Sequence, residues 1–157
     1  MKTPATRSTQ LARGDVWQRV GADDGGFIEG TIGGATYRAE KNTAARLVQQ
    51  GHIQLGATTQ PVAPWETWII NVPNAVGTYA CDDDSINAYI NFGFTEDNLP
   101  VLWDTEQDGG AGCTITVTKA ADAVGDTIEG TFAGTLGDGD GAGHAASAGS
   151  FRLVRLQ

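Results

Sequence analysis

The chain has 157 residues, 22 of them glycine, and a formal net charge of −9 at pH 7. A chain of this length forms one domain with a core large enough to fold without a metal or many disulfides. The negative charge argues against a nucleic-acid partner, because phosphate contacts need a cationic surface. No apolar run approaches the roughly 18 residues of a membrane span.

The first part of the chain, residues 1–26, is polar and is expected to be an arm attached to a globular domain of residues 27–157. Residues 1–20 have a net charge of +3, from Lys2, Arg7, Arg13 and Arg19 against Asp15. The remainder of the chain therefore carries −12. Such an arm either is solvated or lies on an acidic surface, and Trp17 is its aromatic anchor. Its basic start is not followed by an apolar stretch, so a protein that begins here would be made without a secretory signal peptide.

Two hairpins are predicted at the start of the domain. Extended runs over residues 27–32 and 35–40 flank Gly33-Gly34, and a two-residue hairpin turn needs the positive φ angles that glycine adopts readily. A second hairpin is predicted over residues 45–57, with its turn at Gln50-Gly51.

Two prolines and an alternating pattern place the next elements. Pro61 and Pro64 are expected in a loop, because proline has no N–H to donate to a sheet. A strand follows over residues 65–72, and Trp68 lies in register with the apolar residues of its inner face, so it is expected in the core. Residues 73–79 are expected to turn a corner.

The remaining strands show apolar residues at every second position, which indicates a sheet with one buried and one solvated face. The stretch with glycines at 137, 139, 141 and 143 is expected to be a mobile hairpin tip, within a Gly/Ala-rich loop that precedes the last strand. The predicted strands cover residues 86–94, 101–103, 113–118, 127–136 and 150–156. In total about nine or ten strands predict an all-β fold, an antiparallel β-sandwich or a flattened barrel, with an N-terminal arm.

One tetrapeptide occurs twice, as Ile28-Glu-Gly-Thr and as Ile128-Glu-Gly-Thr. The flanking residues do not match. We therefore interpret the repeat as convergence on a favourable strand pattern rather than as a duplicated half-domain.

The chain has two cysteines, Cys81 and Cys113. One is expected at the end of a strand and the other at the start of a strand, so a disulfide between them is predicted, with two independent core thiols as the alternative. A disulfide would indicate an oxidising compartment, such as the extracellular space or the surface of a virion or cell. No Cys-x-x-Cys motif suggests redox chemistry or a zinc site.

Four segments of the sequence resemble those of a known group of domains. They are Gly77-Thr-Tyr, Gly112-Cys-Thr-Ile-Thr-Val-Thr, residues 126–136 and residues 149–155. These resemble small bacterial β-sandwich domains that occur mostly in surface lipoproteins and secreted proteins and that mostly have no assigned function. The resemblance covers residues 27–157. It implies a β-sandwich fold and provides no catalytic residues.

Residues with potential chemistry are few, and no catalytic group, metal or cofactor is predicted. Asp138 and Asp140 have the spacing of a calcium loop, but Gly149 stands where a bidentate glutamate is needed, so they are weak calcium candidates. A Ser-His-Asp set of Ser147, His144 and Asp140 would lie within one Gly/Ala-rich loop, without a rigid element to hold the nucleophile. Two glutamates that could act as a pair, Glu29 and Glu129, are expected on outer strand faces.

Two tryptophans are candidates for a ligand patch at the loop end of the sandwich. Trp65 is predicted at the start of a strand and Trp103 at the end of one. Packing at the rim of the core is the alternative for both.

These features favour a structural module that docks onto a larger assembly, such as a virion or a surface filament, through a protein partner or through self-association. Arm residues Arg7, Arg13, Trp17 and Arg19 would make the contacts. The alternative is a secreted or periplasmic domain that binds a carbohydrate, a peptide or calcium near Trp65 and Trp103.

Overall fold

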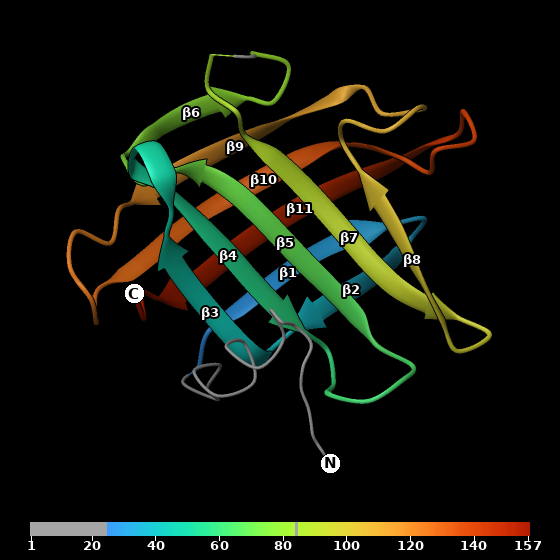
Figure 1. Cartoon of the computed structure of the whole chain (residues 1–157), viewed down its shortest axis with the longest axis horizontal. Helices are drawn as coiled ribbons and strands as arrows, with labels where there is room; N and C mark the ends of the chain where they lie inside the picture. Colours follow the sequence, from blue (N-terminus) through green and yellow to red (C-terminus); the bar gives the residue numbers. More distant parts are fainter. Residues whose placement is uncertain (1–24, 84) are drawn as a thin grey trace.

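The computed structural model describes residues 25–83 and 85–157, and in this part of the chain it contains eleven β-strands, one short 3-10 helix (Gln49–Gly51) and no α-helix (Figure 1). In chain order the strands are β1 (Phe27–Ile32), β2 (Ala35–Ala39), β3 (Lys41–Leu47), β4 (His52–Thr58), β5 (Glu66–Pro73), β6 (Gly77–Ala80), β7 (Tyr89–Glu96), β8 (Leu99–Asp104), β9 (Gly112–Lys119), β10 (Thr127–Gly137) and β11 (Gly143–Val154).

The strands form two antiparallel sheets that face each other, which confirms the predicted sandwich. One sheet has six strands in the order β2-β1-β11-β10-β9-β6, and the other has five in the order β3-β4-β5-β7-β8. In Figure 1 the five-stranded sheet lies in front, and its strands cross those of the sheet behind. Among the described residues, strand pairing passes between the sheets at two places, the pair Gly137–Asp104 and a parallel bridge from Ala45 to Arg155, without closing the structure into a barrel.

The core lies between the two sheets and contains the inward-facing side chains, which come from alternate residues along the strands. Trp68 of β5 is at its centre: the side chain is fully buried, and its ring lies 4.6 Å from Phe92 and 5.2 Å from Phe132, centroid to centroid. Its indole Nε1 donates a hydrogen bond of 3.0 Å to the carbonyl oxygen of Tyr37, so the only polar atom of the side chain is satisfied. The other largest fully buried side chains are Ile28, Ile53, Leu55, Ile70, Ile90, Ile115, Ile128, Leu136, Phe151 and Leu153.

The first predicted hairpin is confirmed, and the charges on its outer face protect a sheet edge. Gly33 and Gly34 form the turn with φ angles of +62° and +83°. On the edge strand β2, Arg38 pairs with Glu29 of β1 at 3.0 Å and with Glu40 at 2.8 Å. Charged side chains along an edge discourage pairing with strands of other molecules.

Two segments differ from the sequence-based expectation. Residues 77–80 form the short strand β6, which pairs with β9, where a corner was expected. The Gly/Ala-rich loop expected up to the strand at residue 150 is wrong over its second half, because β11 begins at Gly143. Residues 143–146 have low strand propensity, but each pairs with a residue of β10, so cross-strand contacts decide their conformation.

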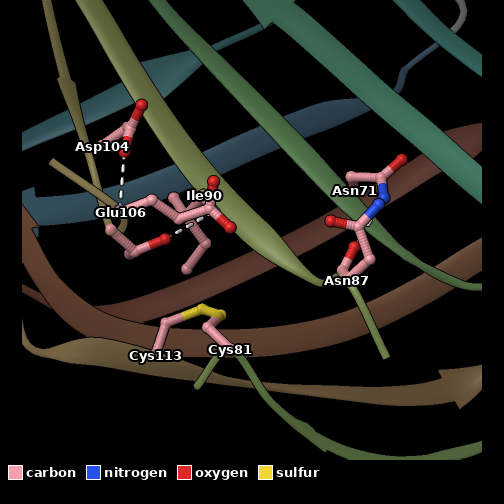
Figure 2. The surroundings of a disulfide bond; sticks show 8 residues. Asn71, Cys81, Asn87, Ile90, Asp104, Glu106 and Cys113 are labelled. Carbon is pink, nitrogen blue, oxygen red and sulfur yellow. Dashed lines mark hydrogen bonds between the residues drawn. A yellow bond between two sulfur atoms is a disulfide. The ribbon is translucent and has the colours of Figure 1, made fainter. Parts of the chain in front are cut away.

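A disulfide joins Cys81 to Cys113, as predicted, and links the end of β6 to the start of β9 (Figure 2). The two Cα atoms are 4.9 Å apart, and the N–H of Cys81 donates a hydrogen bond of 2.8 Å to the carbonyl oxygen of Cys113. Both side chains are buried. This pairing is compatible with an oxidising location. None of the helical structure in the described residues has the length and apolar character that crossing a membrane requires.

Candidate functional site

An apolar groove of about 390 Å³ opens on the outer face of the five-stranded sheet. Three adjacent strands contribute to it: β5, β7 and β8. The lining residues are Trp65, Thr67, Ile69, Gly93, Pro100, Val101 and Leu102. Because the alternate residues of β5 and β7 point into the core, this groove lies on the opposite side of the sheet from Trp68.

Gly93 forms the floor of the groove. In the sheet it pairs with Thr67 on one side and with Leu102 on the other. A Cβ atom at this position would lie 3.5 Å from Cζ3 of Trp65 and 3.9 Å from Cδ1 of Leu102. The missing side chain therefore leaves a depression between an indole ring and an aliphatic side chain.

The backbone of Trp65 is fixed to β7 at both of its polar groups. Its N–H donates to Oγ1 of Thr95 at 3.2 Å, and its carbonyl oxygen accepts from the N–H of Thr95 at 3.2 Å. The preceding loop is closed by a hydrogen bond from Nε2 of Gln60 to the carbonyl oxygen of Pro64. One wall of the groove is thus held by the sheet and not by a free loop.

Strand β8 presents apolar side chains to solvent beside this groove. Leu102 is 47% exposed and Leu99 is 67% exposed. Neither side chain belongs to the buried core. An apolar groove that adjoins exposed aliphatic side chains is typical of a surface that another molecule covers.

Acidic residues lie at both ends of β8. At one end, Glu96 is the last residue of β7 and Asp97 lies in the turn that follows. At the other end, Asp104 is the last residue of β8, and Glu106 and Asp108 come after it. The Asp104 carboxylate accepts hydrogen bonds from the N–H groups of Glu106 and Gln107, at 2.6 and 2.9 Å, the first of which is drawn in Figure 2. Between positions 47 and 118 the chain has nine acidic residues and no lysine or arginine, so strands β4, β5, β7 and β8 contain no basic side chain to balance these carboxylates.

The structure does not bring Trp103 together with Trp65. Trp103 pairs with Phe92, and its ring packs edge-on against Phe94 at 4.8 Å, on the face of β8 opposite to Leu102. Its ring is also stacked on His144 of β11, at 3.7 Å with an interplanar angle of 5°. Trp103 therefore belongs to the rim of the core, and only Trp65 of the two predicted tryptophans lines the groove.

The imidazole of His144 also contacts Asp138, which closes the β10–β11 turn. Nε2 of His144 lies 3.3 Å from Oδ2 of Asp138, and Oδ1 of Asp138 accepts hydrogen bonds from the N–H groups of Asp140 (2.8 Å) and Ala142 (3.2 Å). The bond from the Asp140 N–H, followed by that from His144, lowers the pKa of the Asp138 carboxyl. This carboxylate thus stabilises the turn.

The structure does not bring the other candidate catalytic and metal-binding residues together. His144 pairs with Asp138 and not with Asp140, and Ser147 is exposed on β11. Across residues 25–83 and 85–157, no group of three or more His, Cys, Asp or Glu side chains is arranged to hold a metal ion. Glu29 and Glu129 lie on outer strand faces, as expected, and pair with arginines at 3.0 and 3.9 Å.

Sequence reasoning missed Ile69, Gly93 and Leu102. A signal was present for two of them, because Ile69 is an apolar residue out of phase with the buried residues of β5, and Leu102 is one out of phase with half-buried Trp103 of β8. Gly93 carried no signal of its own, because the alternation of β7 predicts only which residues face inward.

The predicted arm residues Arg7, Arg13, Trp17 and Arg19 lie outside the described residues. Comparison of the chain with protein-family models, with curated proteins and with solved structures found no match.

Proposed function

We propose that this protein is a non-catalytic structural module that docks onto a larger protein assembly at a virion or cell surface through its N-terminal arm. The observation that carries the proposal is the apolar groove between Trp65 and Leu102, which lies in a sheet whose strands β4, β5, β7 and β8 contain no lysine or arginine. The arm has the opposite charge, +3 over residues 1–20, and contains an aromatic residue. These properties suit contacts between copies or homologous subunits of an assembly.

Apolar and charged contacts would have different roles in this attachment. Buried aromatic side chains at the centre of an interface account for most binding energy. Charges at its rim mainly speed association and fix orientation. Trp17 would therefore provide affinity, and Arg7, Arg13 and Arg19 would select an acidic partner surface.

The disulfide supports a location outside a reducing cytosol. The extracellular space and the surface of a virion or cell are consistent with it. Neither location requires a membrane-spanning segment in this chain, because a docked module is held by its protein partner.

The first prediction tests the role of the arm with two substitutions in the full chain. The particulate surface fraction is the isolated virion or cell-surface material that carries the larger assembly. Trp17→Ala is expected to weaken retention on this fraction by about 30-fold or more, the effect of losing an interface hot spot. Arg13→Ala is expected to weaken it by less than about fivefold, the effect of a rim charge. Sedimentation of each purified variant with that fraction measures both effects. Equal losses for the two variants would contradict the proposal.

A secreted or periplasmic ligand-binding domain is the second candidate, because the groove volume falls in the range of ~300–1,000 Å³ that small-molecule sites occupy. Trp65 would then stack on a sugar ring or a peptide side chain. Titration with oligosaccharides or short peptides, followed through the amide NMR signal of Gly93, separates the two. A saturable shift that is unaffected by Trp17→Ala would favour the ligand-binding domain.

A further inference from the structure

We propose that the groove on the five-stranded sheet of one copy receives residues 11–20 from the arm of a second copy, with the indole of Trp17 seated over Gly93 between Trp65 and Leu102. The inference rests on the proposed function and deepens it, because it names the partner surface.

The size and chemistry of the groove suit this segment. A volume of about 390 Å³ accommodates an indole ring and a neighbouring aliphatic side chain. Residues 11–20 are Leu-Ala-Arg-Gly-Asp-Val-Trp-Gln-Arg-Val, in which Val16 and Val20 flank the only tryptophan of the arm. The floor at Gly93 has no side chain, so an aromatic ring can lie flat on the backbone there, against the edge of Trp65.

The charges of the two partners are complementary. Arg13 and Arg19 lie on either side of Trp17 in the sequence. On the receiving surface, carboxylates lie at both ends of β8, with Glu96 and Asp97 at one end and the Asp104 region at the other. A segment laid along β8 with Trp17 at Gly93 would place a positive charge near each acidic end.

The position of β1 favours a second copy over the same chain. The described structure passes from Gly25 into β1, which belongs to the six-stranded sheet, whereas the groove opens on the outer face of the five-stranded sheet. The arm therefore connects to the six-stranded sheet, whereas the groove is on the five-stranded sheet and faces away from the six-stranded one. Contacts between two different surfaces are head-to-tail, and they build rings or filaments when every copy provides both surfaces.

The test mixes two full-length variants that are each defective in one half of the contact. Trp17→Ala removes the anchor and keeps the groove, and Leu102→Glu places a carboxylate in the groove and keeps the arm. Each variant alone is expected to be a monomer of about 16.4 kDa by light scattering after size exclusion, whereas the unmodified chain forms larger species. The mixture is expected to form a species of twice the monomer mass and nothing larger, because one intact arm meets one intact groove.

Matched controls separate loss of the contact from loss of the fold. Val124→Glu introduces the same charge at another exposed aliphatic residue, 62% exposed and outside the groove, and is expected to leave association unchanged. Gly93→Ala is a second groove variant, whose added methyl group would make only ordinary contacts of 3.5 Å or more. It is expected to weaken association while the melting temperature stays the same.

Three other results would each overturn the inference. The first is an unmodified chain that stays monomeric at its solubility limit, and the second is a mixture of the two variants that stays monomeric although the unmodified chain associates. The third is that Val124→Glu abolishes association as fully as Leu102→Glu does. The proposed function is tested separately by retention on the particulate surface fraction, so a monomeric chain whose retention still depends on Trp17 would contradict this inference alone.

Discussion

At the scale of single residues, the repeated tetrapeptide is explained by two glycines that each lie under an aromatic ring. A Cβ atom at Gly30 would lie 2.8 Å from the Trp68 ring, and one at Gly130 would lie 2.5 Å from the Phe151 ring. Both glycines occupy inward-facing positions of strands that flank β11. The two copies of Ile-Glu-Gly-Thr thus solve the same packing problem in two strands, without requiring a duplicated domain.

Replacing one of these glycines is predicted to destabilise the fold. The Cβ atom of Gly130→Ala would lie 2.1 Å from the carbonyl oxygen of Thr116, a backbone atom of the adjacent strand β9, so the strands would have to move apart. The free energy of unfolding should fall by about 2 kcal/mol or more, as in overpacked cores.

Urea denaturation of Gly130→Ala and of the unmodified protein measures the change. Gly93→Ala is the control, because its methyl group meets nothing closer than 3.5 Å and is expected to leave the unfolding curve in place. If the two variants unfold at the same urea concentration, the close approach at Gly130 does not limit the packing.

At the scale of elements, the disulfide is the covalent link between β6 and β9. Strand β6 has four residues and pairs only with β9 among the described strands. Without the disulfide, this short edge strand would be held by few hydrogen bonds. The sequence separation of 32 residues makes the link more stabilising, because a long loop loses much entropy when it is closed.

The double substitution Cys81→Ala, Cys113→Ala is predicted to lower the free energy of unfolding by ~3 kcal/mol, and the melting temperature by roughly 10 °C for a domain of this size. Calorimetry measures the effect, and the unmodified protein in a reducing agent should melt near the same temperature as the variant. A variant that melts with the oxidised protein would show that the disulfide contributes nothing to stability.

Strands with one face in the core could be predicted from sequence alone, because burial imposes a period of two on residue choice. This accounts for β5, β7, β9 and β10. The first half of β11 could not be predicted, since Gly and Ala show no alternation and their strand conformation comes from pairing with β10. β6 is too short to show a period.

The candidate site was less predictable than the fold, for a related reason. Trp65 was identified because an aromatic residue at a strand start is conspicuous. Its partners Gly93 and Leu102 come from other strands and become neighbours only through the register of β7 with β8. That register also decides that Trp103 points into the rim of the core while Leu102 points outward. A single sequence shows which residues alternate, but it does not show which residues of different strands are opposite one another.

At the scale of the whole molecule, the two sheets are joined at one corner by the last residues of the chain. The N–H of Leu156 donates to the carbonyl oxygen of Ala45 at 2.8 Å, and the N–H of Leu47 donates to that of Gln157 at 2.9 Å. The Arg155 guanidinium donates to the carbonyl oxygens of Ala121, Asp122 and Gln157. The backbone bonds fix the end of the chain to β3 of the other sheet, and the Arg155 side chain fixes it to residues 121–122 between β9 and β10.

Arg155→Ala is therefore predicted to lower the free energy of unfolding by about 1–3 kcal/mol, because it leaves carbonyl groups without their charged donor. Arg152→Ala is the matched control, three residues earlier in the chain and within β11. Its side chain is exposed and forms a loose ion pair of 3.9 Å with Glu129, so the change should stay within about 0.5 kcal/mol. Chemical denaturation of the two variants tests the difference, and similar losses would rule out a special role for this corner.

The antiparallel pairing of β1 with β11 also decides how the domain can be connected to other proteins. Phe27 at the start of β1 pairs with Arg152 near the end of β11, so these two positions lie about one strand spacing apart, ~5 Å. The exposed Gly33-Gly34 turn lies at the opposite end of β1. The same adjacency lets the whole sandwich be spliced into a surface loop of a host protein with very short linkers.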